Sequence, residues 1–150
     1  MDLEKYEYLA DEDYKSFMFL SEGPRGQITK VINYRPLVIS PDGLPVINLG
    51  FGDWDEARND IDDSAASNNN DRDKILATVA STVLAFTQVH GKVLVYAEGS
   101  TPAKTRLYQM GINAHFSEVE ALFEVYGQLK GKWVKFERGV NYEAFLVIRR

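Results

Sequence analysis

A chain of 150 residues, 45% of them hydrophobic, is long enough to form one domain with its own core, and we expect a single domain over residues 1–150. The formal net charge of −5 argues against non-specific nucleic-acid binding, which needs a basic face. Because the chain has no cysteine, disulfides, zinc–thiolate sites and thiol catalysis are excluded. The acidic N-terminus lacks the apolar core of a signal peptide, and no apolar run is long enough to span a bilayer. These features predict a cytoplasmic protein that does not enter membranes.

The first half of the sequence predicts an antiparallel β-meander. Apolar and aromatic residues alternate or cluster there, as they do in strands, and turn sequences at residues 23–26 and 41–43 separate them. The expected strands cover residues 3–9, 17–21, 27–37 and 46–51.

Residues 53–72 differ from the predicted meander in composition and periodicity. They are rich in aspartate and asparagine and show no clear period. A segment of this length without secondary structure is long for a loop. We expect a solvated acidic loop, since the spacing of a calcium-binding loop is absent.

Residues 73–90 predict the clearest helix, because apolar residues recur there at intervals of three and four. Gly91 suits the C-terminal cap, and an apolar strand over residues 92–97 follows at once. A strand, a helix and a strand in this order predict a parallel βαβ unit. Further helices are expected from Pro102 to Gly111 and over residues 116–123.

Three short runs close the sequence and predict antiparallel strands at residues 124–127, 133–137 and 142–149. The order of elements therefore predicts an α+β fold. Its sheet is mixed, with an antiparallel N-terminal meander, a central βαβ unit and closing antiparallel strands.

The junction between the strand at residues 92–97 and the next helix is the best candidate for a site. A helix N-terminus offers unpaired N–H groups and a partial positive charge, which suit an anion. A strand end of this kind is also where ligands bind in open α/β sheets. The alternative is that Ser-Thr-Pro merely starts a helix and Arg106 pairs with an aspartate. The expected ligand-binding residues are Gly99, Ser100, Thr101, Lys104 and Arg106.

Other chemistry has weaker support in the sequence. His90 and His115 lack the spacing of metal ligands, so we expect no metal site, although His115 is a weak candidate base. No nucleophile elbow, Walker loop or dinucleotide fingerprint is present.

Three segments resemble a family of small uncharacterised bacterial proteins classified as a domain of unknown function. They are residues 73–80 (DKILATVA), 99–112 (GSTPAKTRLYQMGI) and 141–147 (NYEAFLV). The resemblance covers nearly the whole chain and implies membership of this family, but it implies no activity.

A more distant pattern is similar to the late part of the acetyl-CoA-dependent N-acetyltransferase superfamily. Tyr108, Gly111 and Ile112 match a helix that carries a tyrosine and ends in glycine plus an apolar residue. In that superfamily the tyrosine can protonate the departing thiolate, so the resemblance implies Tyr108 as a catalytic acid. The superfamily's basic, glycine-rich pyrophosphate loop would fall at residues 68–74, where Asp71 and Asp73 would repel a pyrophosphate. Acetyl-CoA is therefore a disfavoured cofactor.

Three hypotheses follow. The first is an uncharacterised protein that binds a small anionic ligand or a protein partner at residues 99–106. The second is an acyl-CoA-dependent N-acyltransferase. The third is a component of a two-gene module of the toxin–antitoxin type.

Overall fold

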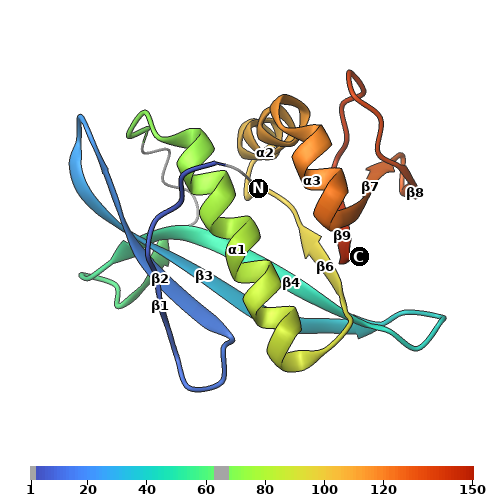
Figure 1. The fold of residues 1–150 in the computed structure, drawn as a ribbon, viewed down its shortest axis with the longest axis horizontal. Coiled ribbons are helices and arrows are strands. Elements are labelled where there is room, and N and C mark those ends of the chain that lie inside the picture. The colour runs from blue at the N-terminus through green and yellow to red at the C-terminus, as the bar shows by residue number, and fades with distance from the viewer. Residues whose placement is uncertain (1–2, 63–67) are drawn as a thin grey trace. The chain divides into compact units, whose positions relative to one another are not determined.

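The structure is a computed structural model that describes residues 3–62 and 68–150 (Figure 1). Its described strands form one nine-stranded sheet in the order β1-β2-β3-β4-β6-β9-β7-β8, with β5 paired to β4. The pairing of β4 with β6 is parallel, whereas β1–β2, β2–β3, β4–β5, β6–β9, β7–β9 and β7–β8 are antiparallel. The predicted α+β class with a mixed sheet is confirmed.

Contacts divide the chain into two units. The N-terminal unit comprises residues 3–35 and 49–91, and the C-terminal unit comprises residues 36–48 and 92–150. The strands β3 (Gly26–Ile39) and β4 (Pro45–Asp55) each continue from one unit into the other.

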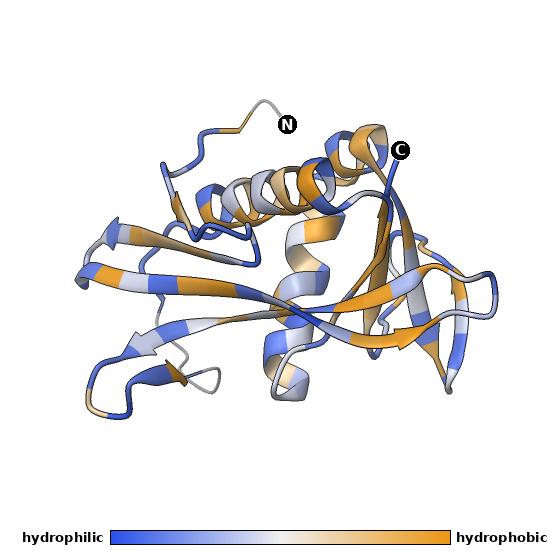
Figure 2. Cartoon of the chain, turned by 90° about the horizontal axis from the view of Figure 1, so that it is seen from below, coloured by the Kyte–Doolittle hydropathy of each residue, from blue (hydrophilic) through white to orange (hydrophobic). Residues whose placement is uncertain are grey.

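The N-terminal unit is a meander covered by one helix. In addition to parts of β3 and β4, it contains β1 (Leu9–Ala10), β2 (Ser16–Gly23), β5 (Asp60–Asp62) and α1 (Arg72–His90). Hydrophobic and hydrophilic residues alternate along its long strands (Figure 2), so that one face of each strand meets the helix. Phe17 and Ile32, which are paired across β2 and β3, are buried in this layer.

The helix α1 buries threonines where a purely apolar stripe was expected. Thr78 and Thr82 are fully buried in the same face as Val83 and Phe86. Each hydroxyl donates to a carbonyl in the preceding turn of the helix and also accepts a hydrogen bond: Thr78 from the amide of Tyr6, and Thr82 from the hydroxyl of Tyr34. A buried hydroxyl is stable when it is satisfied in this way.

Two sequence predictions for this unit are wrong. Residues 3–9 do not form a strand except at Leu9, because the backbone of Tyr6 is bonded to the helix and not to a neighbouring strand. Residues 53–72 are not one loop, since β4 runs on to Asp55 and pairs with β5. The Asp55 carboxylate accepts hydrogen bonds from the amides of Ala57 and Arg58, which forms the turn between them. Residues 63–67 lie outside the described part of the chain.

The C-terminal unit joins parts of β3 and β4 to the later strands and helices of the chain. It contains β6 (Leu94–Ala97), α2 (Pro102–Ala114), α3 (Phe116–Leu122), β7 (Phe123–Leu129), β8 (Lys132–Lys135) and β9 (Phe145–Arg149). The strand β6 lies between β4 and β9, and Val93 and Val95 are buried, so the central position predicted for this strand is confirmed. The helix α2 continues three residues past its predicted end at Gly111.

Candidate functional site: the junction of β6 and α2

The junction between β6 and α2 is a capped helix start, as the sequence predicts. Thr101 is the N-cap residue, and its side-chain oxygen accepts a hydrogen bond of 3.2 Å from the amide of Lys104. Pro102 occupies the first turn, where its fixed φ favours a helix and its missing N–H costs nothing. The cap therefore uses one of the helix donors and leaves others available.

Gly99 is required here by a close approach of the backbone. Its N–H donates to the hydroxyl of Thr105 over 3.0 Å, and that hydroxyl donates to the carbonyl of Thr101. A Cβ atom at position 99 would lie 2.3 Å from the amide nitrogen of Thr105, which is shorter than any real contact. Gly99 thus holds the loop against the first turn of α2.

The end of the helix has a positive character that no acidic side chain of its own offsets. The first turn contains no acidic residue, and the amides of Thr101 and Ala103 make no hydrogen bond to any other described residue. Arg106 is exposed and forms no ion pair within residues 3–62 and 68–150, while Lys104 is half-buried. Ser100 and Thr101 are exposed beside them.

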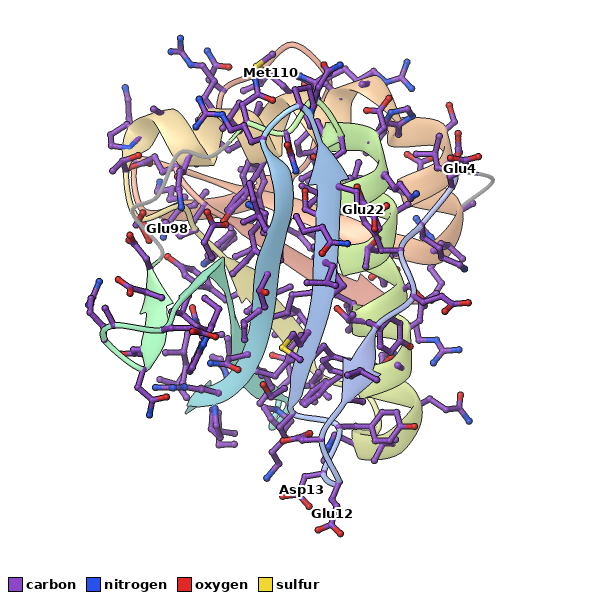
Figure 3. The ribbon with its side chains drawn as sticks, turned by 90° about the vertical axis from the view of Figure 1, so that its left-hand side faces the viewer. Glu4, Glu12, Asp13, Glu22, Glu98 and Met110 are labelled. Atoms are coloured by element: carbon purple, nitrogen blue, oxygen red, sulfur yellow. The ribbon has the colours of Figure 1, made fainter. Side chains whose placement is uncertain are left out.

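The two faces of α2 depart from the usual pattern of a surface helix. Its buried face carries Thr105 and Gln109 as well as Ile112, whereas Leu107 and Met110 are 50% and 44% exposed. The Gln109 side chain donates to the carbonyl of Val140 over 2.6 Å and accepts from the amide of Tyr142 over 3.2 Å. The glutamine thereby fixes the segment before β9, and apolar side chains are left on the outer surface, where Figure 3 labels Met110.

One acidic group next to the junction was missed by the sequence analysis. Glu98 precedes Gly99, and its carboxylate accepts a 2.7 Å hydrogen bond from the hydroxyl of Tyr96. Partial burial, followed by the hydrogen bond and charge of Glu98, raises the pKa of Tyr96 to about 12. The spacing of two residues along an extended chain was the available signal, because it places both side chains on one face.

The other residues that the sequence suggested for catalysis or metal binding do not lie together. Tyr108 is half-buried in α2. His115 lies between α2 and α3. His90 is the last residue of α1, and its ring packs on Phe86. The Nε2 atom of His90 lies 2.6 Å from the carbonyl oxygen of Asp13, which Figure 3 labels at the lower end of the view. Within the described residues, no group of three or more potential ligands could hold a metal ion.

The segment that would correspond to a pyrophosphate loop is occupied by internal hydrogen bonds. Asn69 is buried, donates to Ser21 and to the carbonyl of Gly26, and accepts from the amide of Arg25. Asp71 accepts hydrogen bonds of 2.6 Å from the hydroxyls of Tyr6 and Ser21. Both side chains hold the β2–β3 hairpin and the N-terminal segment to the start of α1.

A second buried polar group in the N-terminal unit is an ion pair. Lys30 on β3 and Asp53 on β4 form a salt bridge in which both side chains are largely buried, and the Lys30 ammonium lies over the ring of Phe51. Lys30 alternates with Ile28 and Ile32 along β3, which places it on the same face as these apolar residues but does not identify a partner. The ion pair therefore connects β3 to β4 in the N-terminal unit.

The chain was compared with known proteins. The model of a family described as "Family of unknown function (DUF6934)" matches residues 2–150, so the chain belongs to that family. No curated protein and no solved structure matches the chain. Among the described residues, no helix combines the length and the apolar character that crossing a bilayer requires.

Proposed function

We propose that this member of a family of unknown function binds a small anionic ligand at the start of α2. The observation that carries the proposal is the set of available donors at the N-terminal end of this helix. The amides of Thr101 and Ala103 and the guanidinium of Arg106 have no partner in the described chain, and the first turn lacks an acidic residue. Helix N-termini with free N–H groups bind phosphates and carboxylates in this way.

The outer face of α2 supports a ligand with an apolar part. Ala103, Arg106, Leu107 and Met110 are all exposed and follow one another at the spacing of a single helix face. An anionic group at the N-terminus would leave the rest of the ligand beside Leu107 and Met110. A short-chain carboxylate combines the two features, and so does an acidic group on a protein partner. We retain the cytoplasmic location expected from the sequence as part of this proposal.

Binding of an anion without an apolar part is tested by titrating the protein with inorganic phosphate and following the backbone amides by NMR. The resonances of Thr101 and Ala103 should shift with saturation. Because a hydrogen bond to a charged group contributes about 1.5–3 kcal/mol, Arg106→Ala should weaken binding about 10- to 150-fold. The matched control is Arg58→Ala, which removes an exposed arginine from the turn between β4 and β5 and should leave the titration unchanged.

Two further measurements sharpen the result. Glu98→Gln removes a carboxylate next to the junction and should strengthen phosphate binding, because a like charge near an anion is repulsive. Leu107→Ser should weaken binding of octanoate without affecting phosphate. A wild-type protein whose amides do not respond to phosphate would refute the proposal, as would an Arg106→Ala variant that melts at a lower temperature and binds phosphate normally.

A further inference from the structure

The last residues of β3 form an exposed apolar strand. Leu37, Val38 and Ile39 are 51%, 62% and 67% exposed, and they follow one another directly before the turn at residues 40–44. This turn is the cyan loop at the lower right of Figure 1. Three consecutive aliphatic side chains place apolar surface on both faces of the strand, because successive side chains point to opposite sides.

One edge of this segment has no neighbouring strand within the described chain. The strand β2 pairs with β3 only as far as Ser16 and Asn33, and the last backbone bond runs from the amide of Tyr34 to the carbonyl of Lys15. On the other edge lies β4. The segment from Leu37 to Ile39 therefore presents backbone groups that another strand can pair with.

The free edge of this segment lacks the usual protection of an exposed strand. Natural edge strands are usually protected by charges. The edge strand β8 carries Lys132 and Lys135, but residues 36–39 contain no charged residue.

We infer that this edge pairs with the same edge of a second copy of the chain, in an antiparallel arrangement about a twofold axis at Val38. Leu37 would then lie opposite Ile39 of the second copy. Such an interface is self-complementary, as a twofold dimer requires.

The charges that flank the apolar run identify the second copy as the partner. Arg35 precedes the run in β3 and Asp42 follows it in the turn; both are exposed, and neither forms an ion pair within the described residues. An antiparallel pairing about Val38 places Arg35 opposite Pro41 of the second copy, next to its Asp42. The twofold axis repeats this attraction at the other end of the interface.

The experiment measures the oligomeric state of the full chain by sedimentation velocity over a series of concentrations. The wild type should dimerise reversibly. Val38→Lys places two like charges opposite each other at the axis, so the dissociation constant should rise on the order of tenfold or more. Leu9→Lys is the matched control, because Leu9 is 68% exposed on β1 and lies outside the inferred interface.

Charge reversal tests the register. Arg35→Glu and Asp42→Lys should each weaken the dimer, and the double variant should restore it, because the attraction is then re-formed with opposite signs. Circular dichroism verifies that each variant folds. A wild type that stays monomeric at high concentration overturns the inference, and so does a dimer that is insensitive to Val38→Lys or a double variant that fails to recover.

Discussion

The carboxylate of Asp71 accepts a hydrogen bond of 2.6 Å from the hydroxyl of Ser21, which lies 50 positions earlier in the chain and is fully buried. Asp71 also accepts a hydrogen bond from Tyr6, so one side chain connects the N-terminal segment, β2 and the start of α1. Glu22, the residue after Ser21, is labelled beside α1 in Figure 3.

Asp71→Ala should destabilise the N-terminal unit. Removal of the acceptor leaves the buried Ser21 hydroxyl without this partner, which costs about 1–3 kcal/mol in the free energy of unfolding. Loss of a cap does not contribute, because the Asp71 side chain makes no cap hydrogen bond. Urea denaturation measures the change. Asp73→Ala, two residues along and exposed, is the control and should stay within about 0.5 kcal/mol of the wild type. Equal losses in the two variants would show that Asp71 has no special role.

Lys30→Met should be more costly than the double variant that removes both charges. The single change leaves a largely buried Asp53 carboxylate without its cation, and breaking a buried pair in this way costs about 3–5 kcal/mol. Lys30→Met combined with Asp53→Leu should recover most of that loss. Urea denaturation of both variants tests the prediction, with the exposed pair Arg72 and Asp73 as the reference, where Arg72→Ala should cost less than about 1 kcal/mol. Additive effects of the two changes would contradict it.

Tyr96 should ionise late in an alkaline titration. Its pKa is raised to about 12 in the folded chain, against about 10 for an unperturbed tyrosine. Below pH 10 the hydroxyl is protonated in both the folded and unfolded states, so its contribution to stability is fully present there. As the pH rises from 10 through 12, the unfolded chain releases the proton first and the contribution is lost.

The measurement is tyrosinate absorbance against pH, together with stability in urea over the same range. Tyr96→Phe should reduce the late step in absorbance by one tyrosine and reduce the loss of stability above pH 10. Burial also raises the pKa of Tyr34, so the ionisation of that tyrosine remains in the late part of the curve. Glu98→Gln should move that step to lower pH, because the carboxylate raises the pKa by its hydrogen bond and its charge. Tyr126→Phe is the control and should leave the step in place. An unchanged late step in Tyr96→Phe would refute the assignment.

Gly99→Ala should destabilise the start of α2. The added methyl group would lie 2.3 Å from a backbone nitrogen, and overpacking of this kind typically costs about 1–3 kcal/mol. Thermal melting checks the effect. Ala103→Ser, an exposed substitution in the same turn, should leave the melting temperature unchanged. A Gly99→Ala variant as stable as the wild type would show that the loop can move away from the helix.

Acetyl-CoA should bind weakly or not at all. A pyrophosphate at residues 68–74 would have to displace the hydrogen bonds of Asn69 and Asp71 and approach the carboxylates of Asp71 and Asp73. Calorimetry tests this expectation. A low-micromolar affinity, on the order of −8 kcal/mol, would contradict it and favour an acyl-CoA-dependent transferase with Tyr108 as the acid.

The sequence by itself determined the elements that depend on local patterns. The three-and-four spacing of apolar residues places α1 within one residue of its observed start, and Gly91 adopts the positive φ expected at its end. Thr101 and Pro102 predict the start of α2, because capping and proline geometry act within a few residues. The parallel pairing of β4 with β6 follows from the intervening helix.

Only the tertiary structure decided which polar side chains are buried and with which partners. The pairing of Lys30 with Asp53, the convergence of Tyr6 and Ser21 on Asp71, and the inward direction of Gln109 all join residues far apart in the chain. For the same reason the threonines of α1 were missed, since a buried hydroxyl becomes favourable only when distant donors satisfy it. Local periodicity carries no information about these partners, because register and packing bring them together only when the chain folds.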